Sequence, residues 1–135
     1  MSQPPFLIYL VDDDEDDLLF IHSAFQELGL EYVCKGFLQA EDLLQHLKFT
    51  AASGERPDVI VLDYEMPRMD GKGLLIAIRN TPALQAVPVL FYSDKISEVL
   101  EQELIALGAL CCIKKGVTAA EQLKFARSIT SFLKK

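Results

Sequence analysis

The sequence predicts an α/β protein with a doubly wound, five-stranded parallel sheet that carries helices on both faces. Five short, mostly apolar segments alternate with stretches in which apolar residues recur every three or four positions. A strand with one solvated face alternates apolar and polar residues, whereas a continuously apolar strand is buried on both faces. Alternation of such strands with helices is typical of a parallel sheet that helices cover on either side.

The first half of the chain is predicted to hold three strands and two helices. The strands are expected at Phe6–Val11, Tyr32–Phe37 and Val59–Leu62. The first helix ends at Gly29, and the small polar residues of Thr50–Pro57 indicate a loop after the second helix. The helices carry on their apolar faces Leu18, Ile21, Phe25 and Leu28 in the first and Leu43, Leu44 and Leu47 in the second.

The second half is predicted to hold three helices and two strands. The strands are expected at Val87–Tyr92 and Ala109–Ile113. A helix through Leu74, Leu75 and Ile78 follows the turn-rich segment Met66–Gly73. The last helix begins at Thr118, which forms a capping box with Glu121 three residues later. The helix between the two strands stops at Gly108 and carries Ile96, Leu100, Leu104 and Leu107.

Length and charge narrow the functions that the chain can have. Its 135 residues suit one domain, which can bury roughly two-thirds of its unfolded surface without disulfides or metal ions. Thirteen basic and twenty acidic residues give a net charge of −7, which argues against a nucleic-acid binder because phosphates attract a basic face. No apolar run approaches the ~18 residues of a membrane span. The first residues also lack the basic charge of a secretory signal.

The three cysteines indicate a reducing compartment. An odd number cannot form a complete disulfide framework, and no Cys-x-x-Cys spacing indicates zinc. We therefore expect a cytoplasmic protein. Cys34, Cys111 and Cys112 are interpreted as small core residues, and the adjacent Cys111 and Cys112 point to opposite faces of their strand.

Polar residues stand at the carboxyl ends of four predicted strands. Asp12 and Asp13 follow the first strand and Asp63 follows the third. Ser93 and Lys115 follow the fourth and the fifth. Ligands of an open α/β sheet bind beyond these strand ends, so we expect the five side chains to converge. Three carboxylates at one point repel each other, and a divalent cation with oxygen ligands, Mg²⁺ or Mn²⁺, relieves that repulsion.

The same five residues suit the chemistry of a phosphoryl group. The cation and the ammonium of Lys115 would neutralise phosphoryl oxygens, and the hydroxyl of Ser93 would donate a hydrogen bond to one of them. One of the carboxylates could act as the nucleophile and form an acyl phosphate.

Four segments in this order resemble the response-regulator receiver domain, the CheY-like family, over essentially the whole chain. They are Val11–Asp13, Leu62–Gly71, Val89–Ser93 and Gly108–Lys115. The resemblance implies one receiver domain over residues 1–135, without an output domain, and a flavodoxin-like (βα)₅ fold with strand order 2-1-3-4-5. The loop before the third strand and the stretch Asn80–Val87 are similar to single-domain regulators that partner phytochrome-type kinases.

The resemblance also assigns a role to each acidic residue of the site. Asp63 resembles the phosphoacceptor, which takes a phosphoryl group from the phosphohistidine of a histidine kinase. Asp12 and Asp13 resemble the acid pair that holds Mg²⁺ together with Asp63. The backbone carbonyl of Glu65 would complete the protein ligands of the ion.

The resemblance further implies how the protein signals. Ser93 takes the place of the switch hydroxyl that follows the phosphoryl group, and Lys115 that of the lysine that pairs with a phosphoryl oxygen. The partner would be a histidine kinase or a phosphotransfer protein, and neither nucleic acid nor a membrane is implied. The face of the fourth helix, fifth strand and fifth helix would contact a target or a second copy of the chain in a homodimer. The chain would not be an enzyme beyond its own phosphotransfer and autodephosphorylation.

Three positions depart from the family pattern. Cys112 stands in the slot of the aromatic switch residue, Asp94 where a small residue is usual and Gly116 where proline is usual. A thiol cannot swing like a tyrosine ring, and an added carboxylate opposes a phosphoryl charge. An alternative function therefore stays open, a pseudo-receiver that binds partners with weak or no switching. A cis bond without proline costs roughly 2.5–4 kcal/mol, so the bond between Lys115 and Gly116 is expected to be trans.

Other interpretations of the acidic run of residues 12–17 fit the sequence less well. An EF-hand loop needs glycine at its sixth position and glutamate at its twelfth, where Asp17 and Ser23 stand. A haloacid-dehalogenase-like phosphatase has threonine or valine at the position of Asp16. Residues Asp14–Asp17 are interpreted as solvated acids of the loop and the first helical turn, which are favourable beside the helix dipole.

Overall fold

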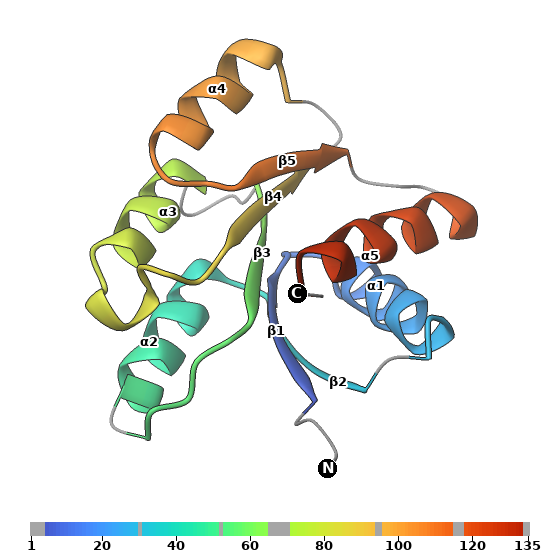
Figure 1. The fold of residues 1–135 in the computed structure, drawn as a ribbon, viewed down its shortest axis with the longest axis horizontal. Coiled ribbons are helices and arrows are strands. Elements are labelled where there is room, and N and C mark those ends of the chain that lie inside the picture. The colour runs from blue at the N-terminus through green and yellow to red at the C-terminus, as the bar shows by residue number, and fades with distance from the viewer. Residues whose placement is uncertain are drawn as a thin grey trace.

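A computed structural model describes residues 5–29, 31–51, 53–64, 71–93, 96–114 and 118–133 (Figure 1). Its centre is a five-stranded parallel sheet in the order β2-β1-β3-β4-β5, so the predicted fold class and strand order are confirmed. The strands are β1 (Phe6–Val11), β2 (Tyr32–Phe37), β3 (Val59–Asp63), β4 (Val89–Ser93) and β5 (Cys111–Lys114). The helices are α1 (Glu15–Glu27), α2 (Ala40–Ala51), α3 (Gly71–Arg79), α4 (Glu98–Ala106) and α5 (Ala119–Leu133), with a 3₁₀ turn η1 (Pro82–Leu84). Within these ranges no helix is long and apolar enough to cross a membrane.

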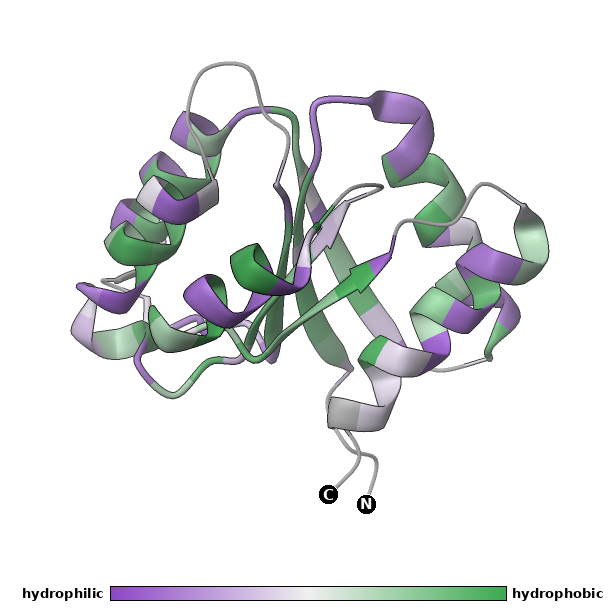
Figure 2. Cartoon of the chain, turned by 90° about the horizontal axis from the view of Figure 1, so that it is seen from above, coloured by the Kyte–Doolittle hydropathy of each residue, from purple (hydrophilic) through white to green (hydrophobic). Residues whose placement is uncertain are grey.

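The sheet separates two hydrophobic cores. Helices α2, α3 and α4 pack on one face, and α1 and α5 pack on the other (Figure 1). Figure 2 shows hydrophobic residues concentrated on the strands of the sheet and on the helix sides that face it. Strands β3 and β4 are buried along their whole length, as their continuous apolar sequence predicts. Successive side chains of β4 enter opposite cores, Phe91 the first and Tyr92 the second.

Helix α1 begins within the acidic run of residues 12–17. The carboxylate of Asp14 accepts a hydrogen bond of 2.9 Å from the backbone N–H of Asp16 and caps the helix. The acids of the first turn are Glu15, Asp16 and Asp17. Their charges are favourable beside the positive end of the helix dipole, so the interpretation of these residues as acids of a helix start is confirmed.

The capping box predicted at the start of α5 is present. The backbone N–H of Thr118 donates to the carboxylate of Glu121, and the backbone N–H of Glu121 donates to the Thr118 hydroxyl, each at 3.1 Å. Two N–H groups at the helix start, which have no partner within the helix, are satisfied in this way. The cap therefore fixes the point at which the chain enters α5.

Two helices extend beyond their predicted bounds. Helix α2 includes Thr50, which was assigned to the following loop. Its buried hydroxyl donates to the carbonyl of Leu47 at 3.3 Å, so the helix satisfies this polar group internally. Helix α3 begins at Gly71, inside the segment predicted to form turns.

The last two strands begin two residues later than predicted. Strand β4 begins at Val89 rather than Val87 because Pro88 has no N–H to donate to the ladder. Strand β5 begins at Cys111 rather than Ala109. The N–H of Ala109 donates instead to the carbonyl of Leu104 at 3.0 Å, which keeps this residue in the turn after α4.

Gly71, the first residue of α3, lies against side chains of β4 and of the segment that follows β3. A Cβ atom at this position would stand 2.6 Å from Cε1 of Phe91 and 2.9 Å from Cδ1 of Tyr64. The Phe91 ring is fully buried in the core and has no space into which to move. The first turn of α3 therefore depends on the missing side chain.

We expect Gly71→Ala to lower the free energy of unfolding by about 1–3 kcal/mol, because the added methyl overpacks the core. Urea titration followed by circular dichroism would measure the change. Gly73→Ala is the matched control, since Gly73 is exposed on the same helix and alanine favours a helix. An unchanged midpoint for Gly71→Ala would show that the helix shifts away from Phe91 without cost.

Candidate functional site

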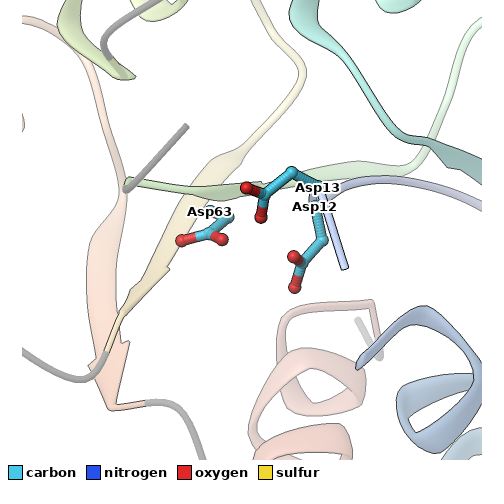
Figure 3. Close-up of side chains that lie close together, drawn as sticks. All are labelled: Asp12, Asp13 and Asp63. Atoms are coloured by element: carbon cyan, nitrogen blue, oxygen red, sulfur yellow. The ribbon is translucent and has the colours of Figure 1, made fainter. Parts of the chain in front are cut away.

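Three aspartates meet at the carboxyl ends of β1 and β3. These strands are parallel neighbours, and Val11 pairs with Leu62, so the residues that follow the pair lie side by side. Asp12 and Asp63 are buried and Asp13 is exposed. One carboxylate oxygen from each residue lies within 4.8 Å of the others, and Figure 3 shows the three side chains close together. The predicted convergence of the three acids is therefore present.

The carboxylate of Asp12 is held by the protein at both of its oxygens. The backbone N–H of Asp14 donates to Oδ1 at 2.9 Å. The phenol of Tyr92, from β4, donates to Oδ2. The backbone N–H of Asp12 donates to the carbonyl of Phe37 at 3.0 Å, which anchors its main chain to the end of β2. Main chain and side chain of this acid are therefore both fixed.

The donor set of the cluster fits a hard divalent cation. Carboxylate oxygens are the ligands that Mg²⁺ and Mn²⁺ prefer, and the described cluster offers neither a thiolate nor an imidazole. Gathering three negative charges in one place is unfavourable unless a positive charge joins them. Asp12, Asp13 and Asp63 could therefore hold such an ion.

Ser93 lies at the end of β4, with 3% of its surface exposed, beside strand β3, which carries Asp63. It pairs in register with Lys114 of β5. Four other residues with predicted roles, Glu65, Asp94, Lys115 and Gly116, lie outside the described residues. The roles of the Glu65 carbonyl and of Lys115, and the trans bond between Lys115 and Gly116, stay predictions.

Cys112 borders a cavity of about 300 Å³ beneath α4. The cavity is lined by Ser93, Ile96, Glu101, Cys112, Ile113 and Lys114. Cys112 packs against the core under α2, α3 and α4 and Cys111 against the opposite core, so the predicted opposite orientation of the two thiols is confirmed. Cys112, which stands at the position of the family's aromatic switch residue, is therefore a small side chain that borders the same open space as Ser93.

Burial and negative neighbours make the cysteines poor nucleophiles. Burial, and then the charge of Glu101 and the neighbouring Cys111, raise the pKa of the Cys112 thiol to about 11. The backbone N–H of Cys112 also donates to the Glu101 carboxylate at 3.1 Å. Burial raises the pKa of Cys34 to about 11. All three cysteines are free thiols, in agreement with the sequence-based expectation.

Tyr92 is the site residue that the sequence did not reveal. Its side chain is fully buried, and burial followed by the charge of Asp12 raises its pKa, so the phenol stays protonated and remains a donor. One feature of the sequence could have pointed to Tyr92: it stands one residue before Ser93 in a strand that is predicted to be buried. A buried tyrosine hydroxyl needs a hydrogen-bond partner, and the end of this strand lies near the acidic cluster.

Comparison with known proteins agrees with this geometry. The family model of the response regulator receiver domain matches residues 8–127. The response regulator Rcp1 of Synechocystis is 27% identical over 139 residues, which cover 97% of this chain and 90% of Rcp1. FilR2, a probable methanogenesis regulatory protein of Methanothrix harundinacea, is 28% identical over 98 residues, which cover 72% of this chain and 63% of FilR2. The structure of the phosphorylated cyanobacterial phytochrome response regulator RcpA superposes with a TM-score of 0.84 at 25% identity, over 96% of this chain and 94% of RcpA.

We expect Asp13→Ala to weaken Mn²⁺ binding by more than about 10-fold, because an ion ligand is lost, while the fold persists. Without metal, this variant should melt at the same or a higher temperature than the unchanged protein, since one of three repelling charges is gone. Electron paramagnetic resonance of free Mn²⁺ and thermal unfolding would measure the two effects. Asp16→Ala is the control, because Asp16 is an exposed acid of α1 outside the cluster. Equal Mn²⁺ affinity in both variants would contradict the assignment.

We expect Cys112 to react with iodoacetamide at pH 8 roughly 100-fold more slowly than an unperturbed thiol, because only the thiolate reacts. The rate should rise about tenfold per pH unit up to the raised pKa, since the thiolate fraction rises in that proportion. Tandem mass spectrometry, with fragment ions from cleavage between the two adjacent residues, separates Cys112 from Cys111. Glu101→Gln should speed the labelling of Cys112, because it removes a charge that opposes the thiolate. Labelling at the rate of an unperturbed thiol would contradict this environment.

Proposed function

The chain belongs to the response-regulator receiver domain family, and we propose on this premise that Asp63 accepts a phosphoryl group from a histidine kinase. The convergence of Asp12, Asp13 and Asp63, with one oxygen of each within 4.8 Å of the others, is the observation that carries the proposal. Asp63 is the last residue of a fully buried central strand. A nucleophile at a strand end is held more rigidly than one on a loop.

The transfer is a direct displacement at phosphorus. A carboxylate oxygen of Asp63 forms a bond to the phosphorus of a phosphohistidine, and the P–N bond breaks. The imidazole leaves as a neutral ring after it takes up a proton, and an acyl phosphate remains on Asp63. Asp12 and Asp13 would hold Mg²⁺ or Mn²⁺, which would supply positive charge to neutralise the phosphoryl oxygens. Apart from this transfer and the hydrolysis of its own acyl phosphate, the chain is no enzyme.

Ser93 and Lys115 respond to the phosphoryl group in this proposal. Ser93 is buried at the end of β4, from which its hydroxyl donates to a phosphoryl oxygen. Lys115 follows the residue that pairs with Ser93, and its ammonium neutralises another phosphoryl oxygen. The Glu65 carbonyl would complete the protein ligands of the ion. Movement of Ser93 toward the phosphoryl group then pulls the loop between β4 and α4.

The signal passes by protein contacts. The partner is a histidine kinase or a phosphotransfer protein, and similarity to the phytochrome response regulator RcpA favours a phytochrome-type kinase. The face of α4, β5 and α5 contacts the target or a second copy of the chain. Neither nucleic acid nor a membrane is a partner, and the negative charge of −7 supports the first of these statements. The cytoplasm is the compartment that fits free thiols.

One observation favours a second candidate, a pseudo-receiver that binds partners without efficient switching. Cys112 occupies the aromatic switch slot and borders a cavity of about 300 Å³ that Ser93 also lines. A thiol has too little bulk to close and open such a space. Asp94 and Gly116, which also depart from the family pattern, favour the pseudo-receiver as well. Phosphorylation tests the two candidates against each other.

Incubation with acetyl phosphate and Mg²⁺, followed by intact-mass measurement, should show the gain of one phosphoryl group. Asp63→Asn should abolish the gain, because an amide cannot form an acyl phosphate. Asp42→Asn is the control, since Asp42 is an exposed acid of α2. If the unchanged protein binds Mg²⁺ but gains no mass, the pseudo-receiver is the better description. A gain that survives Asp63→Asn would place the phosphoacceptor elsewhere.

A further inference from the structure

Tyr92 reaches the acidic cluster from a strand that is not a neighbour of β1. Strand β3 lies between β1 and β4, and Tyr92 pairs in register with Asp63. From there its hydroxyl donates to Oδ2 of Asp12, 80 residues away in the sequence. One phenol thus connects the strand that carries Ser93 with the strand that carries the first two acids.

The ring of Tyr92 is held so that its hydroxyl stays in place. It lies in the core under α1 and α5, with its centroid 5.2 Å from that of Phe125 at an interplanar angle of 42°. Both side chains are buried, with exposed fractions of 0% for Tyr92 and 4% for Phe125. Packed side chains at native density leave no alternative rotamer for a ring of this size.

The Asp12 carboxylate is thereby fixed by donors from two separate elements. The N–H of Asp14 binds Oδ1 at 2.9 Å from the start of α1, and the phenol of Tyr92 binds Oδ2 from β4. Two donors on opposite oxygens define the plane of the carboxylate. Each oxygen of a carboxylate can accept more than one bond, so this arrangement is compatible with a bound cation.

We propose that Tyr92 is a positioning residue, whose hydroxyl holds Asp12 in the orientation in which it ligates the divalent cation. The inference rests on the proposed function, which assigns Asp12 to that ion. A ligand that is already oriented loses little side-chain entropy on binding, so the hydrogen bond strengthens cation binding without touching the ion. Partners of metal ligands typically account for 10–100-fold in metal affinity.

The test compares Tyr92→Phe with Tyr9→Phe in a titration with Mn²⁺, followed by electron paramagnetic resonance of the free ion. Each variant removes only a hydroxyl from a fully buried tyrosine. Tyr9 lies in the opposite core and its hydroxyl donates to Glu55, which is not part of the cluster, so its loss controls for a general effect on the fold. We expect Tyr92→Phe to bind Mn²⁺ about 10-fold more weakly and Tyr9→Phe to bind it as the unchanged protein does.

A second readout follows from acyl phosphate formation. The Mg²⁺ concentration that gives half-maximal phosphorylation should rise about 10-fold in Tyr92→Phe, while the rate at saturating Mg²⁺ stays close to that of the unchanged protein. A purely structural role of the tyrosine would lower the rate at every Mg²⁺ concentration. Such a uniform loss, or equal Mn²⁺ affinity of Tyr92→Phe and the unchanged protein, would overturn the inference.

The unchanged protein provides a measurement that does not depend on the folding of a variant. With tyrosines labelled with ¹³C at Cζ, saturation with Mg²⁺ should shift the Tyr92 resonance and leave that of Tyr9 in place. A Tyr92 resonance that does not respond to bound Mg²⁺ would overturn the inference but leave the proposed function intact. If the unchanged protein binds neither Mg²⁺ nor Mn²⁺, the cation part of the proposed function fails and the inference fails with it.

Discussion

Repulsion among three carboxylates is the constraint on which the rest of the structure depends. Asp12, Asp13 and Asp63 hold oxygens within 4.8 Å of one another, and two of these residues are buried. A parallel sheet makes this possible, because the adjacent strands β1 and β3 end at the same edge and fix their terminal residues. Hydrogen bonds to Asp12 from Tyr92 and the Asp14 N–H offset part of the cost. A divalent cation would supply the remaining compensation.

Consecutive residues at the end of β4 contact the two cores and the site in turn. Strand β4 sends Phe91 into the core under α2, α3 and α4, where it packs against Gly71, and sends Tyr92 into the core under α1 and α5. Ser93, the next residue, ends the strand beside the acids. A displacement at the end of β4 would therefore change side-chain packing in both cores. The half-buried Cys112 on the edge strand β5 leaves open space on the α4 side, so this side has more room to adjust.

The parts of the fold that depend on local pattern could be predicted, and those that depend on contacts between distant residues could not. Mostly apolar runs predicted the five strands, and acids at the carboxyl ends of two strands predicted the cluster. The edge strands β2 and β5 are only partly buried, and β2 contains Lys35. Because Tyr92 lies within an apolar run, the sequence predicts only that it is a core residue. Its hydrogen bond to Asp12 depends on the order of the strands in the sheet. Glu55 was assigned to a polar loop, yet hydrogen bonds from Tyr9 and Lys35 lower its pKa to about 2. Helix and strand ends were missed where packing or a neighbouring turn decided them, as at Gly71 and Ala109.

A crystal structure of the protein with Mg²⁺ and beryllofluoride, which imitates a phosphoryl group, would test the central claim most directly. The carboxylate cluster should then hold beryllofluoride on Asp63, with Mg²⁺ bound by oxygens of Asp12 and Asp13 at about 2.0–2.1 Å. The hydroxyl of Ser93 should point toward a fluorine atom. Beryllofluoride on another carboxylate, or Mg²⁺ bound away from Asp12 and Asp13, would contradict the claim that these three acids form a phosphoryl-accepting cation site.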